Sequence, residues 1–183
     1  NEAKKAIKKS ISLNSSYEEA YVNLGMLKAA ENKIDEAINN FDKAILINPN
    51  NPKFKMNKAM LLLLDGNFKQ GWKLYESRLQ LSKNTYINEI YKNRPWNGKK
   101  SLENKTILLF SEQGLGDTIQ FIRYAKILVD LNANVIIAVQ KVLINFLKQL
   151  EPEIKIVSKE ENNVFDYFCP LLSIQYIFGS NIK

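Results

Sequence analysis

The amino-acid sequence predicts an α + α/β chain, in which an all-α superhelix of stacked helix pairs precedes an α/β layer with a parallel sheet. Three observations support this prediction. Helical patterns recur at a spacing of about 34 residues in the first 81 positions, a period typical of helical solenoids. The recurrence ends before residue 105. Beyond that point short apolar runs alternate with helical patterns, as they do in parallel sheets.

The composition favours a folded protein and excludes several kinds of site. The chain has 183 residues, of which 45% are hydrophobic, enough for a buried core. It has no histidine, which excludes histidine-based catalytic triads and zinc sites, and we expect no bound metal. The one cysteine, Cys169, lies in an apolar run, where we expect a buried, inert thiol. A single cysteine also suits a reducing, cytoplasmic location.

The charge of the chain indicates a solvated surface rather than a nucleic-acid interface. The net charge is +7, and its excess lies in the first hundred residues. These positive charges are mostly lysines spread over several helix faces. We therefore expect no nucleic-acid partner. No window approaches the 18 or so apolar residues of a membrane span, and we expect none.

The first half of the chain contains a clear pair of amphipathic helices. We expect helices over residues 18–30 and 34–47, ended by the turn that holds Pro49. Small residues at Gly25 and Ala37 would let the two helices approach closely, and Phe41 would fill the space between neighbouring pairs. The inward stripes are predicted to consist of Ala20, Tyr21, Leu24 and Leu27 in the first helix and Ile34, Ala37, Ile38, Phe41, Ala44 and Ile45 in the second.

Ala37, Phe41, Ala44 and Pro49 stand at the spacings of the tetratricopeptide repeat, which this segment resembles. The resemblance implies a partial repeat over residues 1–17 and whole repeats over 18–51 and 52–81. Arg78 departs from the pattern, which has alanine there. Because the first helix starts in the middle of a repeat, we expect more repeats before residue 1. Such arrays bind a protein or peptide partner in a groove.

The first helix of each repeat carries the candidate groove residues. Asn23 and Asn57 occupy the same repeat position, and so do Met26 and Met60. An asparagine ladder can hold an extended peptide backbone because each amide both donates and accepts hydrogen bonds. Methionines would supply an adaptable apolar floor. This arrangement resembles the groove of the protein O-GlcNAc transferases, although exposed asparagines could also coincide in a chain rich in them.

We expect a junction over residues 82–104, with Trp96 docking the two halves together, and an α/β domain over 105–183. Strands are predicted at 106–110, 135–139 and 154–157, with a possible fourth at 165–168. Helices are predicted at 118–132 and 142–150. The glycine turn at 113–117 joins the first strand to the first helix, which is where such folds bind ligands.

The turn does not match a known nucleotide motif. A dinucleotide fingerprint would need a third glycine where Ile119 stands, and an acidic residue where Gln140 ends the second strand. There is no Gly-Lys-Ser or Gly-Lys-Thr triplet either, so a P-loop is excluded. The sequence therefore argues against an NAD or ATP site.

The segment ILLFSEQGLGDTIQFIRY resembles the N-terminal, Rossmann-like half of bacterial heptosyltransferases, which belong to the two-domain GT-B glycosyltransferases. A second match is FDYFCPLLSIQYIFG. The resemblance implies that Asp117 is the general base, whereas Asp117 could equally cap the helix. Arg123 could hold an acceptor anion or form a structural ion pair. The expected ligand-binding residues are Gln113, Gly114, Leu115, Gly116, Thr118, Gln120 and Arg123.

The sequence leaves two functions open. In the first, the chain is a fragment of a bacterial repeat-containing glycosyltransferase, whose repeats bind a protein partner or acceptor and whose α/β part forms half of an acceptor cleft. The nucleotide-sugar donor would then need a second domain, so the fragment alone should bind no cofactor and be inactive. Ser111, Glu112 and Gln113 stand where heptosyltransferases often have a basic residue. In the second function, the chain is a non-catalytic scaffold capped by the α/β part.

Overall fold

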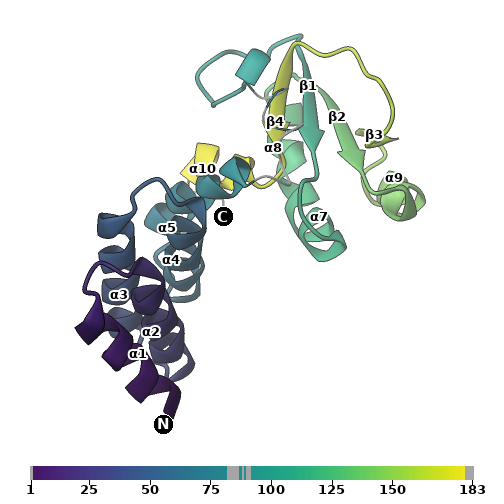
Figure 1. Ribbon diagram of the computed structural model, residues 1–183. Helices are drawn as coiled ribbons and strands as arrows, with labels where there is room; N and C mark the ends of the chain where they lie inside the picture. Colours follow the sequence, from purple (N-terminus) through teal and green to yellow (C-terminus); the bar gives the residue numbers. More distant parts are fainter. Residues whose placement is uncertain (1, 82–86, 88, 90–91, 180–183) are drawn as a thin grey trace. The chain divides into compact units, whose positions relative to one another are not determined.

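The computed structural model describes residues 2–81, 87, 89 and 92–179. The chain divides into two compact units, Asn1–Leu81 and Ser82–Lys183. The first unit consists of helices, and the second contains a four-stranded parallel sheet with helices (Figure 1). The predicted α + α/β fold class is therefore confirmed.

The helical unit is a succession of antiparallel helices in which each helix packs on the next. The bounds of α2 and α3 agree with the sequence prediction. The helices are α1 (Glu2–Leu13), α2 (Glu18–Ala30), α3 (Ile34–Ile47), α4 (Pro52–Leu64) and α5 (Phe68–Tyr75), followed by a 3-10 helix (Glu76–Gln80).

Local sequence signals set the ends of these helices. The Asn51 side chain accepts a hydrogen bond from the Lys53 N–H, and Pro52 occupies the first helical position of α4, where its missing N–H costs nothing. Asn32 and Gly66 adopt positive φ angles of 58° and 82° in the tight turns that follow α2 and α4. The turns within both repeats thus use residues that tolerate left-handed backbone.

Phe41 lies at the centre of the helical core, as the sequence predicts. It is 2% exposed and clusters with side chains of its own repeat and with Phe54 and Leu61 of α4. A methyl group on Gly25 would lie only 2.9 Å from Phe41 Cε1, so the close approach of α2 and α3 needs glycine there. The stripe of α2 differs in part, because Val22 and Gly25 are buried whereas Tyr21, Leu24 and Leu27 are only partly buried.

The segment predicted to be the next repeat, residues 52–81, has Arg78 at the position that corresponds to the buried Ala44. Here the chain has changed from α5 to the 3-10 helix, and the arginine side chain is fully buried. Its Nη1 lies 2.5 Å from Glu76 Oε1, and its guanidinium carbon lies 5.2 Å from the centre of the Tyr75 ring. A buried charge needs such partners because its desolvation costs several kcal/mol.

The sheet of the second unit has the strand order β3-β2-β1-β4, with every pair parallel. This is the order of the first half of a doubly wound α/β sheet. The central strand β1 is apolar, and Ile107 and Leu109 are completely buried. Cys169 is also buried, as predicted. The strands are β1 (Thr106–Phe110), β2 (Asn134–Val139), β3 (Lys155–Ser158) and β4 (Tyr167–Pro170).

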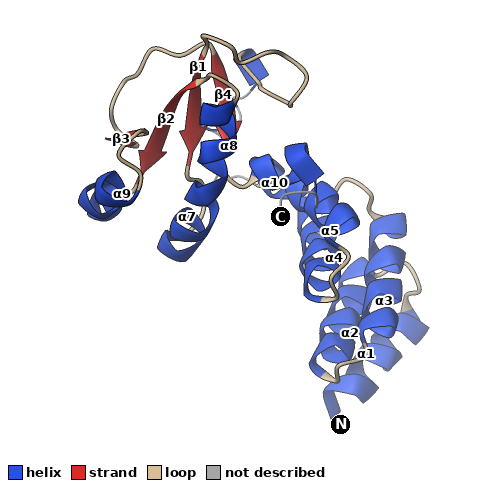
Figure 2. Cartoon of the chain, turned by 180° about the vertical axis from the view of Figure 1, so that it is seen from behind, coloured by secondary structure: helices blue, strands red, loops and turns tan. Residues whose placement is uncertain are grey.

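The helix predicted at 118–132 begins earlier and is interrupted. Gly114 is its N-cap, so Gly116 and Asp117 lie in the first helical turn rather than in a loop. The segment consists of α7 (Leu115–Phe121), a 3-10 turn (Ile122–Tyr124) and α8 (Ala125–Asp130). Figure 2 shows α8 in front of the sheet and α7 beyond the carboxyl ends of the strands. The remaining helices are a 3-10 turn (Lys141–Leu143), α9 (Ile144–Leu150) and α10 (Ser173–Phe178).

The stretch expected to be a junction belongs to the second unit, and its residues 94–96 run beside β4. Pro95 forms a parallel β-bridge with Phe168, which belongs to β4. The Phe168 N–H donates to the Arg94 carbonyl at 2.7 Å, and the Trp96 N–H donates to the Phe168 carbonyl at 3.0 Å. Trp96 is 2% exposed, and its Nε1–H donates to the Lys100 carbonyl at 2.9 Å. These contacts of Trp96 lie within the second unit.

Candidate functional site

Polar and charged residues gather at the carboxyl edge of the sheet. Residues 111–113 follow β1, Gln140 follows β2 and Lys159 follows β3. β2 and β4 lie on opposite sides of β1, because the chain first adds β2 and β3 on one side of β1 and then crosses to add β4 on the other. In open α/β sheets the crevice at such a point binds ligands. The end of β1, where the sequence predicts a ligand site, is therefore the candidate site.

Gln140 organises this edge through its side-chain amide. Its Oε1 accepts from the Ser111 hydroxyl at 3.2 Å and from the Thr118 hydroxyl at 3.1 Å. Its Nε2 donates to the Gln113 carbonyl at 2.9 Å. The sequence predicts that Thr118 binds a ligand, but this residue is 1% exposed and its side chain instead holds the turn through its hydrogen bond to Gln140. Gln140, which stands where a dinucleotide site would have an acidic residue, thus connects Ser111, Gln113 and Thr118 by hydrogen bonds.

Asp117 lies in the first turn of α7 and caps it. Its Oδ2 accepts a hydrogen bond from the Gly114 N–H at 3.2 Å. The capping interpretation of Asp117 is therefore supported by geometry. The side chain is only half-buried, and its other oxygen has no hydrogen bond to a described residue. The cap thus leaves one carboxylate oxygen able to accept a proton or a hydrogen bond.

The two glycines of the turn are not required by the packing of the chain. Gly114 has a φ of −69°, which any residue can adopt. A methyl group on Gly116 would meet no atom within 4 Å, and one on Gly114 would lie 3.5 Å from Asp117 Oδ2, an ordinary contact. Glycine is a favourable N-cap at position 114, but inside the helix, at position 116, it lowers stability relative to alanine. The open space above Gly116 is therefore available for another molecule.

Gln113 adds an unused donor to the same turn. Its Nε2 atom is buried and has no hydrogen-bond partner among the described residues. A buried donor without a partner costs about 1–3 kcal/mol, so such groups are usually satisfied by a ligand or a water. Of the predicted site residues, Gln113 and Asp117 supply the side-chain groups at this turn that can still bind.

Gln120 and Arg123 lie further along the helical segment, and both are exposed. The Arg123 Nε donates to the Gln120 carbonyl at 2.7 Å, so the guanidinium turns back on its own helix. In the described part of the chain, neither side chain bonds to the 113–118 turn. The structure thus places these two predicted residues on the helix surface. Leu115 is 46% exposed at the helix start.

A lysine and a glutamate complete the edge, and the sequence analysis did not find this pair. Glu112 Oε2 accepts from the Leu171 N–H at 3.1 Å, which links the ends of β1 and β4. Burial lowers the pKa of Lys159, and the nearby Glu112 carboxylate acts in the opposite direction. The Lys159 ammonium lies 5.2 Å from the centre of the Phe110 ring. A cationic group therefore reaches this edge from β3, although none precedes the glycine turn in sequence.

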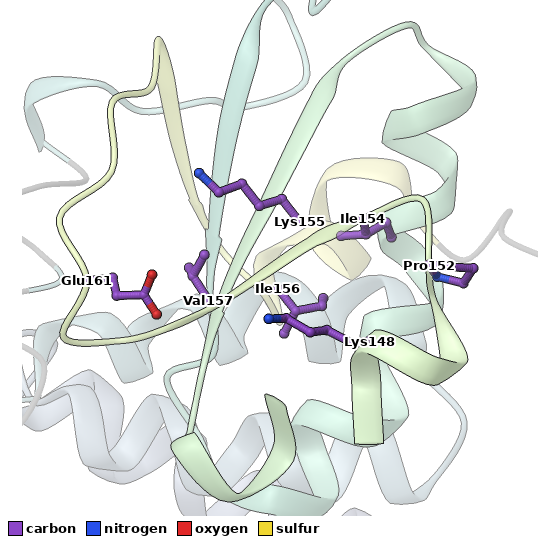
Figure 3. Close-up of a pocket in the computed structure, with 7 residues that line it drawn as sticks. All are labelled: Lys148, Pro152, Ile154, Lys155, Ile156, Val157 and Glu161. Atoms are coloured by element: carbon purple, nitrogen blue, oxygen red, sulfur yellow. The ribbon is translucent and has the colours of Figure 1, made fainter. Parts of the chain in front are cut away.

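A separate pocket of about 440 Å³ opens beside the edge strand β3. Figure 3 shows the side chains that line it, among them the basic Lys148 and Lys155 and the apolar Ile156 and Val157. Glu161 lies on the opposite side, where its carboxylate accepts from the Ser158 N–H at 2.8 Å. None of the residues of the glycine turn lines this pocket.

The structure leaves the predicted groove residues accessible in the helical unit. Met26 is 57% exposed on α2, and Met60 is 54% exposed on α4. Asn23 is exposed, and Asn57 is partly buried. Each helix therefore presents an asparagine and a methionine at matching positions.

The described residues form neither a metal-binding cluster nor a membrane span. No group of three or more Cys, Asp or Glu side chains in that part of the chain could hold a metal ion. None of the helices there combines the length and apolar character that crossing a bilayer requires.

Comparison with known proteins identifies the helical repeat. The tetratricopeptide repeat family model matches residues 18–51. A search of curated proteins found no significant match. A solved structure of a mutant O-GlcNAc transferase from Thermobaculum terrenum is similar over 85% of this chain, at 14% sequence identity and a TM-score of 0.41, and the match covers 37% of that chain. Residues 18–51 thus form a tetratricopeptide repeat, which precedes an α/β unit with a parallel sheet.

Proposed function

We propose that this chain belongs to a repeat-containing glycosyltransferase, in which the helical unit binds a peptide and the α/β unit forms the acceptor side of the cleft. The carrying observation is the carboxylate of Asp117 at the carboxyl edge of the sheet, where one oxygen accepts from the Gly114 N–H and the other has no hydrogen bond to a described residue. In this role Asp117 takes the proton of an acceptor hydroxyl as the sugar–phosphate bond of the donor breaks.

The charges at the turn favour a neutral acceptor hydroxyl over an anion. The carboxylate of Asp117 already occupies the positive end of α7, where an anionic ligand would otherwise be favoured. An alcohol can donate a hydrogen bond to the Asp117 carboxylate, whereas a second negative charge at this position would be repelled.

Substitution of Asp117 separates its two roles. Asp117→Asn keeps an oxygen that can accept from the Gly114 N–H but removes the base. In the full-length protein we expect this variant to lose about 10²–10⁴-fold in transfer rate with little change in melting temperature. Asp117→Ala should lose the rate and also about 1 kcal/mol of stability through the missing cap. Asp130→Asn, at the end of α8, is the control and should match the parent.

The assay follows acid-precipitable label transferred from tritiated UDP-N-acetylglucosamine or ADP-heptose. A parental rate in Asp117→Asn would contradict the base assignment. If the parent transferred no label from either donor, the enzyme proposal would fail and the scaffold function would replace it.

The tetratricopeptide repeat supports a separate peptide-binding role for the helical unit, because such repeats generally mediate protein interactions. We expect Asn23→Ala/Asn57→Ala to weaken binding to an immobilised library of random peptides. The control is Asn39→Ala/Asn50→Ala, which removes two exposed asparagines from α3 and the turn that follows it. Equal binding by both double variants would contradict the ladder.

A further inference from the structure

We propose that the peptide groove is selective for charge: it takes an extended segment with a basic residue facing Glu19 and, about three positions away, an acidic residue facing Lys53. This inference rests on the peptide-binding role proposed for the helical unit. It adds the chemistry of the partner, which neither the repeat match nor the asparagine positions supply.

Glu19 and Lys53 lie on the faces that carry the groove residues. Glu19, Asn23 and Met26 are spaced i, i+4 and i+7 on α2, so they share one helix face. Lys53, Asn57 and Met60 repeat this spacing on α4. The two helices thus carry the same residue type at the asparagine and methionine positions, whereas the charged position is acidic in α2 (Glu19) and basic in α4 (Lys53).

Both charges are exposed, and their side chains make no hydrogen bond or ion pair with the residues that the structure describes. Their neighbours on the same two helices differ. The adjacent Glu18 accepts from Asn48 Nδ2 at 3.1 Å, and Lys58 on α4 pairs with Asp42 at 2.5 Å. Glu18 and Lys58 are thus paired within the unit, while Glu19 and Lys53 on the groove face remain available to a partner.

The spacing of the two charges follows from how the repeats stack. α2 and α4 both pack on α3 and contribute Val22, Phe54 and Leu61 to one core cluster, so they are neighbours around a common centre. Neighbouring helices of such a layer lie on the order of 10 Å apart. An extended peptide advances about 3.3–3.6 Å per residue, so about three residues cover that distance. Met26 and Met60 add exposed apolar surface about two helical turns further along the same two faces, roughly 10 Å from the charges.

The test uses three fluorescent peptides on the same neutral background of Ala, Ser and Gly with one central Leu. The mixed peptide carries Lys and Glu three positions apart, the acidic peptide carries two Glu there, and the basic peptide carries two Lys. Fluorescence anisotropy at low salt measures their affinities for the 183-residue chain. We expect the parent to prefer the mixed peptide about threefold or more, the effect of one exposed charge pair against one repulsion.

Charge substitutions should change which peptide binds most tightly. The Glu19→Lys variant should bind the acidic peptide most tightly, and the Lys53→Glu variant should bind the basic peptide most tightly. The double variant Glu19→Lys/Lys53→Glu should restore the mixed peptide, because a peptide bound in the reverse direction again meets opposite charges. Failure of the double variant to restore this preference would overturn the proposal.

The chain offers a matched control pair. Asp35 and Lys69 are exposed, lie one repeat apart in the first turns of α3 and α5, and carry the same two signs. Asp35→Lys/Lys69→Glu should leave the preference for the mixed peptide unchanged. If the parent binds all three peptides equally and the groove variants change nothing, charge selectivity is wrong while peptide binding stands. If the parent binds none of them, the peptide-binding role itself fails.

Discussion

At the scale of single residues, two helical glycines have opposite surroundings. A methyl group on Gly71 would lie 2.7 Å from Leu63 Cδ2 and 3.1 Å from the Leu63 backbone nitrogen, whereas Gly116 has no neighbour within 4 Å. We expect Gly71→Ala to lower the free energy of unfolding by about 1–3 kcal/mol, because backbone must move to relieve the overlap. Urea denaturation of the variant and the parent measures this difference.

Gly116→Ala is the matched comparison, and we expect it to raise the free energy of unfolding rather than lower it. Its added methyl group meets open space, and alanine favours the helix by up to about 0.5–1 kcal/mol. Under the proposed function the same methyl group narrows the acceptor space, so transfer should weaken as stability rises. A variant with higher stability and full transfer activity would show that no acceptor approaches Gly116.

The candidate site could be predicted only in part from its residues. The glycine turn and Asp117 stand next to each other in sequence, so a local motif reveals them. Gln140 and Lys159 reach the same edge from the ends of other strands. The rule that parallel strands end at one edge could have pointed to both, because Gln140 directly follows a predicted strand and Lys159 lies two residues beyond the end of another. The burial of Thr118 depends on tertiary packing and has no local signal.

At the scale of elements, Glu31 links the turn after α2 to its neighbours. It lies 3.5 Å from Lys4 of α1 and 3.0 Å from Lys33, while Glu36 of α3 pairs with Lys28 of α2. The hydrogen bond from Lys33 lowers the pKa of Glu31, and the one from Lys28 lowers the pKa of Glu36. These pairs therefore join three successive helices.

The sign of the resulting pH dependence follows from these lowered pKa values. A carboxylate with a lowered folded-state pKa stabilises the fold above its ordinary value of 4.5, and this contribution is lost as the pH falls through the lowered value. We expect the parent to lose more stability between pH 6 and about pH 3 than Glu31→Gln does. Urea denaturation at both pH values tests this, and an equal loss in the two proteins would contradict it.

The elements themselves were largely predictable where a repeat or an apolar run defined them. The period of the repeat fixes α2 and α3, and the run of five apolar or β-branched residues fixes β1. The start of α7 was predicted three residues too late because glycine is a poor helix former, whereas here Gly114 caps the helix and Gly116 lies inside it. The fourth strand ends at Pro170, two residues beyond the prediction, where β1 supplies the pairing partner.

At the scale of the whole molecule, each unit has its own core. Phe41 belongs to the helical cluster and Phe168 to the cluster of the sheet, and both are almost fully buried. We expect Phe41→Ala to lower the stability of the helical unit by about 3–5 kcal/mol, and Phe168→Ala to do the same for the α/β unit.

Hydrogen–deuterium exchange followed by peptide mass spectrometry separates the two effects. Phe41→Ala should speed exchange in α2–α4 and leave β1 and β2 protected, and Phe168→Ala should show the reverse. Faster exchange throughout the chain in either variant would show that the two units unfold as one.

The segment beside β4 has a consequence for how this sheet meets other chains. Pro95 lines the outer side of β4 but has no N–H, so hydrogen bonding to a further strand is broken there. On the opposite side, β3 is only four residues long and begins with the exposed Lys155. Short, charged or proline-bearing margins are the means by which natural sheets resist intermolecular strand addition and fibril growth. The apolar central strands are thereby shielded from aggregation.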